Sequence, residues 1–183
     1  MKYSRLAALL TCLASSLGPP GLITVFQEDF AGKHALSTTL FQMGFPVLAR
    51  DWLFSKHLDV ESGVGFMSAL QGLRSLAVGG LCWLAVPCSS WVFMSRGTTG
   101  RSRLTVRRRR RYQKVRSANR IARRTCYLVT YLEAKGCYWA LENPSSSILW
   151  LYPPMRRLLD REGTYMLTVP LGLYGASSQK LEH

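Results

Sequence analysis

The chain has 183 residues, and its hydrophobic fraction of 48% is enough to build one substantial core. It carries 24 Lys and Arg residues against 10 Asp and Glu residues, a formal charge of +14, and this combination is not that of a disordered chain. Such a positive field attracts polyanions. Nucleic acid is the commonest large one, and anionic membrane surfaces are the alternative.

Five cysteines and three histidines restrict the redox and metal chemistry. The cysteines are odd in number, none lies in a Cys-x-x-Cys motif, and the histidines are scattered. This pattern predicts a reduced, intracellular protein without a structural metal.

The first 20 residues allow two interpretations. Lys2 and Arg5 precede an apolar stretch of signal-peptide length, but no clear Ala-x-Ala cleavage site follows. We favour a helix that ends at Gly18, while the signal-like character leaves organellar or secreted targeting open. No apolar run approaches the roughly 20 residues that span a bilayer, so we expect no transmembrane helix. Residues 21–183 are predicted to form one domain.

Strands and helices alternate along that domain. A β-branched and aromatic strand is predicted at 21–32, and a short helix with apolar residues every three or four positions at 33–44. A second strand follows at 45–51. A helix at 61–80 then leads to a continuous apolar strand at 81–86, typical of a strand covered on both faces.

The second half of the chain begins with a basic, arginine-rich loop at 96–124. An amphipathic helix starts within this basic segment, near Val115, and stops at Gly136. A strand is predicted at 137–144, a broken helix at 145–163 and a last strand at 164–175. The alternation predicts an α/β, three-layer, Rossmann-like fold with a mostly parallel sheet and helices on both faces.

Polar residues follow four of the predicted strands. Ligands of such sheets bind beyond the carboxyl ends of the strands, where these residues are expected to converge. The four groups are Glu28 to Gly32, Asp51, Pro87 to Ser90, and Glu142 to Pro144.

The order of these motifs resembles that of the cytosine-5 DNA methyltransferase family, which has a class I S-adenosylmethionine-dependent fold. The resemblance covers roughly residues 22–180 and is most specific in Pro87-Cys88 followed by Glu142-Asn143. The chain departs from the family pattern at Val86 and Ser89. It also stops at His183, which leaves no room for a target-recognition domain, so the fold is expected to be truncated and another chain to supply recognition.

The resemblance implies a nucleophilic mechanism on cytosine. Cys88 would add as a thiolate to C6, and nearby cations would lower its pKa. Glu142 would act as a general acid at N3, with a pKa raised by a closed apolar pocket. Asn143 would hold Glu142 or the neighbouring backbone. Each motif also has a purely structural interpretation, as a strand end or a turn.

The implied cofactor is S-adenosyl-L-methionine. Gly32 would let the backbone approach it, and Asp51, 19 positions later, would reach its ribose as acidic residues do in dinucleotide-binding folds. Asp51 could instead be a helix N-cap. The cofactor set implied by the resemblance is Phe30, Ala31, Gly32, Asp51, Asp59 and Pro87.

The basic loop is predicted to contact nucleic-acid phosphates beside an extruded base, with DNA favoured over RNA. The alternatives are a solvated loop or a nuclear-localisation patch. The predicted contacts are Arg96, Arg101, Arg103, Arg107, Arg108, Arg109, Arg110 and Arg111.

Three hypotheses therefore remain open from the sequence. The favoured one is a divergent methyltransferase domain that acts on nucleic acid through Cys88. The second is a catalytically silent nucleic-acid-binding module on the same fold. The third is a basic protein of membrane surfaces or the secretory route.

Overall fold

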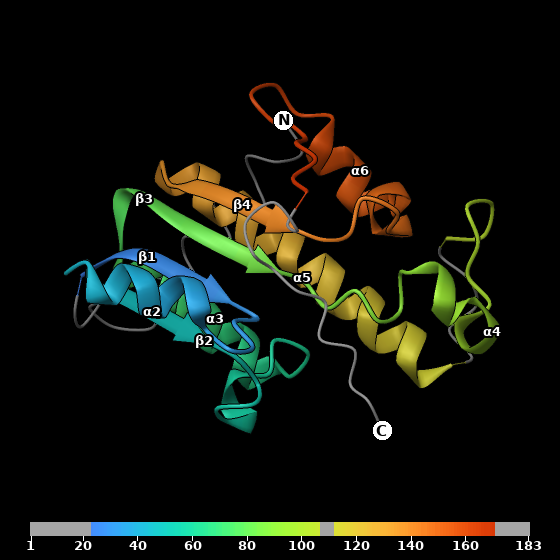
Figure 1. Ribbon diagram of the computed structural model, residues 1–183, viewed down its shortest axis with the longest axis horizontal. Coiled ribbons are helices and arrows are strands. Elements are labelled where there is room, and N and C mark those ends of the chain that lie inside the picture. The colour runs from blue at the N-terminus through green and yellow to red at the C-terminus, as the bar shows by residue number, and fades with distance from the viewer. Residues whose placement is uncertain (1–22, 107–111, 171–183) are drawn as a thin grey trace.

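Four strands form a parallel sheet in the order β2-β1-β3-β4 (Figure 1). They are β1 (Thr24–Asp29), β2 (Val47–Arg50), β3 (Leu76–Ala85) and β4 (Tyr138–Glu142). The computed structural model describes residues 23–106 and 112–170. Within these residues every neighbouring strand pair is parallel, which confirms the predicted α/β fold.

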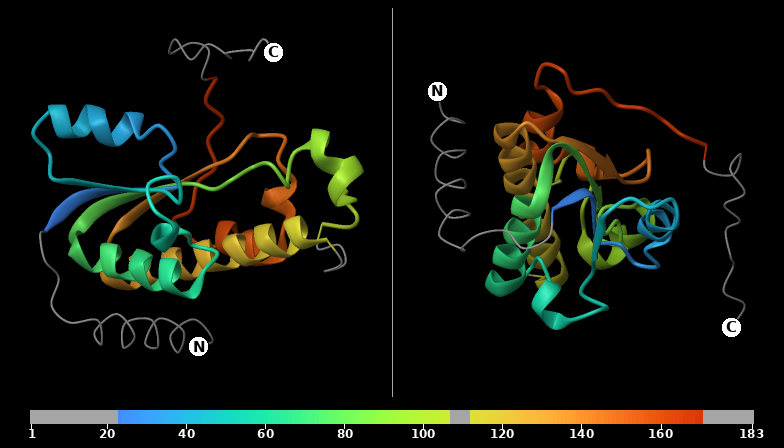
Figure 2. Two further views of the ribbon diagram at one scale, coloured as in Figure 1. Left: turned by 90° about the horizontal axis from the view of Figure 1, so that it is seen from below. Right: turned by 90° about the vertical axis from the view of Figure 1, so that its left-hand side faces the viewer.

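Helices lie on both faces of the sheet (Figure 2). On one face is α2 (Ala35–Gln42), and on the other are α3 (Gly63–Ser75) and α5 (Gln113–Lys135). The alternation of side chains along β1 agrees with this assignment, because Glu28 accepts a 2.9 Å hydrogen bond from the Ser37 backbone of α2. Further short helices are η1 (Lys56–Leu58), η2 (Phe93–Ser95), α4 (Arg96–Thr99), η3 (Ile148–Leu151) and α6 (Pro153–Leu159).

The hydrophobic core lies between the sheet and the α3–α5 layer. Leu70 and Leu73 of α3, Leu84 of β3, and Leu128 and Leu132 of α5 are all fully buried. The apolar stripe predicted along α5 is therefore its inward face. α6 packs on the same helix and extends the core past the edge of the sheet.

The boundary between α3 and β3 differs from the sequence prediction. A helix was expected to continue to residue 80, but α3 ends at Ser75 and β3 begins at Leu76. The Lys135 ammonium explains this end, because it donates to the Leu73 carbonyl at 2.7 Å and to two further carbonyls at the helix terminus. The register shift between β1 and β3 then accommodates Gly79, whose φ is +76°.

The last predicted strand is not formed in its described part. Residues 164–170 have no regular secondary structure, and their apolar side chains are exposed, with Leu167 at 83%. A strand requires a hydrogen-bonded neighbour, and these residues pair with no strand in the described part of the chain. Residues 171–175 lie outside the described residues.

Candidate functional site

A pocket of about 270 Å³ opens at the carboxyl ends of β1, β2 and β3. Its far wall is formed by the first turns of α5. Asp29, Asp51, Asp59 and Glu61 line it, which is four of the 10 acidic residues of a strongly basic chain. Two cations, Arg50 and Lys114, line it as well, and Arg50 is paired with Asp29. The lining therefore carries a formal excess of two negative charges where a parallel sheet places ligands. This composition suits a cationic or hydroxyl-rich ligand.

Asp51 holds the loop after β1 in place. One of its carboxylate oxygens accepts the Gly32 N–H at 2.9 Å, and the other accepts the Leu53 N–H at 2.8 Å. The backbone N–H of Ala31 also donates to the Arg50 carbonyl at 3.1 Å. The predicted meeting of Gly32 and Asp51 at one edge of the sheet is thus present. Asp51 and Phe30 line the pocket, but Gly32 is not among its lining residues.

The same loop has an unusual backbone. Phe30, Gly32 and His34 have φ values of +61°, +52° and +45°. Positive φ is unfavourable for a bulky residue such as Phe30, and strain of this kind is concentrated at ligand sites. A Cβ at Gly32 would meet no atom within 4 Å, so in this structure its backbone angle, rather than lack of space, favours glycine.

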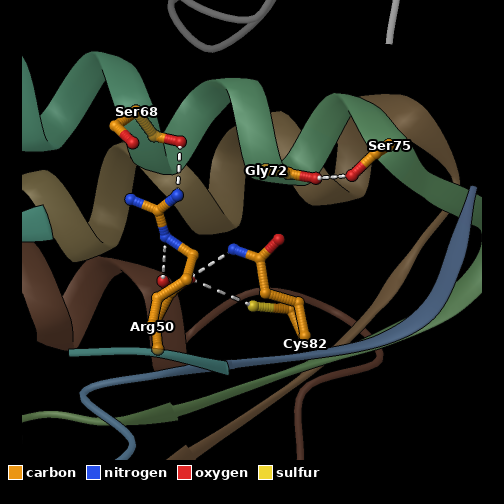
Figure 3. Close-up of polar contacts among 7 residues, drawn as sticks. Arg50, Ser68, Gly72, Ser75 and Cys82 are labelled. Carbon is orange, nitrogen blue, oxygen red and sulfur yellow. Dashed lines mark hydrogen bonds and ion pairs between the residues drawn. The ribbon is translucent and has the colours of Figure 1, made fainter. Parts of the chain in front are cut away.

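Asp29 and Arg50, which line the pocket, belong to a buried polar cluster whose contacts are drawn in Figure 3. Asp29 accepts hydrogen bonds from Arg50 Nε at 3.0 Å and from Gln27 Nε2 at 2.7 Å, and the Cys82 thiol lies 3.7 Å from it. Arg50 also donates to the Ser68 carbonyl of α3 at 2.6 Å, as Figure 3 shows. Burial raises the pKa of Asp29, opposed chiefly by the charge of Arg50.

Gly72 of α3 makes room for this cluster. A Cβ there would lie 2.8 Å from the Gln27 side-chain oxygen and 3.3 Å from Arg50 Nη1. The sequence prediction did not include the cluster. Its signal was two polar residues, Gln27 and Asp29, spaced two apart and therefore on the same face of the strand.

The rim of the pocket joins the segment before α3 to α5. Asp59 lines it and accepts the Glu61 N–H at 2.8 Å. Glu61 in turn accepts the Ser117 hydroxyl of α5 at 2.5 Å. Trp52, next to Asp51, also lines the pocket and is 57% exposed. Sequence reasoning identified Asp59 but missed Trp52 and Glu61, because no motif marked them.

The predicted nucleophile lies in a tight turn beyond β3. The Cys88 carbonyl accepts the Trp91 N–H at 2.8 Å, and the thiol-bearing residue is half-buried. Its neighbours Pro87 and Ser89 line the pocket, whereas Cys88 is not among the lining residues. Cys88 therefore stands next to the pocket, at the end of a strand that reaches it.

Glu142 and Asn143 end the neighbouring strand β4. The register places Glu142 beside Ala85, and its carboxylate accepts the Trp83 indole N–H at 3.2 Å. Asn143 donates to the Val86 carbonyl at 2.6 Å and so connects the ends of the two strands. Its side-chain oxygen is buried without a hydrogen-bond partner among the described residues.

The closed apolar surroundings predicted for Glu142 are not present. Glu142 is exposed and does not line the pocket. It shares a sheet face with Trp83 and Glu28, the face on which α2 lies, but α2 contacts β1 and β2. β4 stands at the edge of the sheet in the described residues, so solvent reaches this carboxylate.

Arg101 is the clearest correction to the predicted nucleic-acid contacts. It is 1% exposed and donates to Ser90 Oγ at 3.1 Å, to the Val106 carbonyl at 2.6 Å and to Asn119 Oδ1 at 2.9 Å. Its guanidinium also lies 3.7 Å from the centroid of the Trp91 ring. Burial lowers its pKa to about 10, so it stays charged at neutral pH. A side chain with these partners cannot reach a phosphate.

The other predicted arginines have different surroundings. Arg96 is half-buried, with its guanidinium 4.3 Å from the centroid of the Phe93 ring. Arg103 is exposed. Arg107, Arg108, Arg109, Arg110 and Arg111 lie outside the described residues. Of the described set, Arg103 is thus the arginine most open to a partner.

Comparison with known proteins gives no relative for this chain. No protein-family model matches it, and neither a curated protein nor a solved structure shows significant similarity to it. Among the described residues no helix has both the length and the apolar character needed to cross a membrane.

Proposed function

We propose that the chain is an S-adenosylmethionine-dependent methyltransferase-like protein that modifies cytosine C5 in nucleic acid, with DNA as the favoured substrate. The acidic pocket at the carboxyl edge of the sheet, with Asp51 fixing the loop after β1, is the observation that carries this proposal. When bound, adenosylmethionine would supply a methyl group carried on a sulfonium centre.

The residues of the pocket fit this cofactor. Asp51 uses one acceptor position on each oxygen for backbone N–H groups, and a carboxylate has about four such positions, so it can still accept a ribose hydroxyl. The exposed indole of Trp52 can stack on a purine. The four carboxylates of the pocket outnumber its two cations, Arg50 and Lys114, which favours the cationic sulfonium and amino groups. The volume of about 270 Å³ is slightly below the range of about 300–1,000 Å³ that is usual for ligand pockets.

Cys88 is the proposed nucleophile. Its thiolate would form a bond to C6 of the pyrimidine, while Glu142, in its acid form, would donate a proton to N3. The electron pair then available at C5 would take up the methyl group, with S-adenosylhomocysteine as the leaving group. Loss of the C5 proton to a base, cleavage of the C6–sulfur bond and return of the N3 proton to Glu142 would restore the ring, the thiolate and the acid form of Glu142. Asn143 would keep the ends of β3 and β4 in register, through its contact with Val86.

A catalytically silent nucleic-acid-binding module is the second candidate. The observation in its favour is the exposed position of Glu142, which hydrogen bonds to Trp83 rather than facing the pocket. A silent module would retain the fold and the charge but would not complete the covalent step.

Covalent trapping distinguishes the two candidates. An oligonucleotide containing 5-fluorocytosine is incubated with the protein and adenosylmethionine, and adducts are resolved by denaturing electrophoresis and mass spectrometry. The fluorine blocks the final elimination, so the enzyme is expected to give an adduct that Cys88→Ser abolishes. Cys126→Ser, which changes a buried thiol, is the matched control and should retain the adduct. The absence of any adduct in the wild type would favour the silent module.

A further inference from the structure

The solvent-facing side of α5 carries a row of exposed arginines, none of which lines the acidic pocket. Arg116 and Arg123 are exposed, and the Arg120 side chain between them is 51% exposed. The spacings of four and three residues place them on one side of the helix. At 1.5 Å per residue the row is about 10 Å long. We call these three residues the α5 arginine row.

The cations in the first turn of α5, Lys114 and Arg116, are costly for the helix. The N-terminal end of a helix carries partial positive charge, which disfavours cations there. Yet residues 113–125 of α5 include five Lys and Arg residues and no acidic residue. Tyr112, the N-cap residue, makes no side-chain capping hydrogen bond either. Helix dipole and side chains therefore add to one concentrated positive field.

Not all of these cations are available to a partner. Arg124 donates to the Val60 carbonyl at 2.6 Å and lies over the Phe66 ring, so it connects α5 to the segment before α3. Burial lowers the pKa of Arg124, and the charges of Arg120 and Arg123 lower it further. Arg120 lies 3.6 Å from Glu61, which offsets part of its charge. Arg116 and Arg123 have no such carboxylate partner among the described residues.

We propose that the α5 arginine row is a docking surface for the phosphodiester backbone of nucleic acid. Each strand of a duplex advances about 3.4 Å per phosphate, so a row about 10 Å long spans about three phosphates. The planar guanidinium of arginine binds a phosphate through two parallel hydrogen bonds. This surface deepens the proposed function because it assigns a contact for the nucleic-acid partner, but it does not require methyl transfer.

A membrane surface fits the row less well. Helices that bind bilayers present an apolar side that enters the lipid. The apolar side of α5 is already buried in the core, including Val115, Ala122 and Val129. Tyr127 is the exposed aromatic residue that continues the row. With no apolar side to insert, the exposed arginines suit a hydrated polyanion.

Salt-dependent binding of labelled duplex DNA, and of duplex RNA of the same sequence, tests the proposal by fluorescence anisotropy. The test variant is Arg116→Gln with Arg123→Gln. The matched control is Arg156→Gln with Arg157→Gln on α6, because these exposed arginines lie on another helix and their removal changes the net charge equally. Comparison of the DNA and RNA titrations shows whether the surface binds DNA, RNA or both.

The α5 variant is expected to lower the slope of log K against log salt by about two units and to weaken binding about 50-fold at 0.1 M salt. The control should change both quantities much less. Arg116→Lys with Arg123→Lys, which keeps the charges, should restore most of the slope. Unchanged unfolding curves would exclude misfolding as the cause of the loss.

Three results would overturn the proposal. One is an α5 variant that binds like the wild type, and another is an equal loss in the α6 control, which would reflect net charge alone. The third is loss of binding to phosphatidylserine vesicles with unchanged binding to both duplexes. Titration of the α5 variant with S-adenosylhomocysteine separates this proposal from the proposed function, since its cofactor affinity should stay that of the wild type.

Discussion

Two arginine-rich regions of the chain have opposite structural roles. In residues 96–106 the central arginine, Arg101, is buried and joins the turn after β3 to the first turns of α5. In α5 the arginines of the row face solvent. A run of positive charge in a sequence therefore does not identify its binding residues. What separates the two regions is whether backbone carbonyls and a tryptophan ring surround the guanidinium.

Removing Arg101 is the change with the largest expected effect. Arg101→Met would leave the Val106 carbonyl and Asn119 without their donor and would remove the contact with Trp91. We expect the free energy of unfolding, measured by urea denaturation, to fall by about 3 kcal/mol. Arg103→Met is the matched control at an exposed site and should change stability by less than about 0.5 kcal/mol. Equal effects would mean that Arg101 is not a structural arginine.

Residues 107–111, a run of five arginines, lie in the sequence between residues 96–106 and α5. Their contribution to nucleic-acid binding can be compared with that of α5. Replacing Arg107, Arg108, Arg109, Arg110 and Arg111 with serine is expected to reduce the salt slope of nucleic-acid binding, by up to about 0.9 units for each lost phosphate contact. The measurement is the anisotropy titration described above. Unchanged affinity and slope would show that the run is a solvated segment and that α5 alone carries the contacts.

The reaction rates of the cysteines test how accessible Cys88 is in the turn after β3, which Arg101 holds through Ser90. Burial raises the pKa of Cys126 to about 12 and that of Cys82 well above its usual range, whereas Cys88 is half-buried. At pH 8 only about one Cys126 thiol in ten thousand is ionised.

Iodoacetamide is therefore expected to modify Cys88 at least tenfold faster than Cys82 or Cys126, as followed by peptide mass spectrometry. The experiment uses a Cys12→Ala background, because Cys12 lies outside the described residues. Modification of Cys82 first would contradict the burial of β3.

The sequence predicted those parts of the site that follow from strand order. The carboxyl ends of parallel strands meet at one edge, so Gly32, Asp51 and the Cys88 turn could be placed together before the structure was known. The pairing of Asp29 with Arg50 could not, because it depends on which strands are neighbours and on Gly72 leaving room above them.

The exposure of Glu142 and the burial of Arg101 were missed for a related reason. Both depend on packing between distant segments, whereas the motifs describe only local chemistry. β4 lies at the edge of the sheet, and the helix on its side contacts other strands, so Glu142 is open to solvent. The described part of the predicted last strand, residues 164–170, was wrong for a similar reason, since alternation of apolar residues shows strand character but not the presence of a pairing partner.

Isothermal titration with S-adenosylhomocysteine tests most directly whether the acidic pocket is a cofactor site. The wild type is expected to bind, and Asp51→Asn to weaken binding at least tenfold, about 1.4 kcal/mol, because it removes the negative charge beside Gly32. Asp160→Asn, which changes an exposed carboxylate at the C-terminal end of α6 that does not line the pocket, should bind like the wild type. Thermal unfolding of each variant verifies that it is folded. No binding by the wild type, or equal binding by Asp51→Asn, would contradict the account.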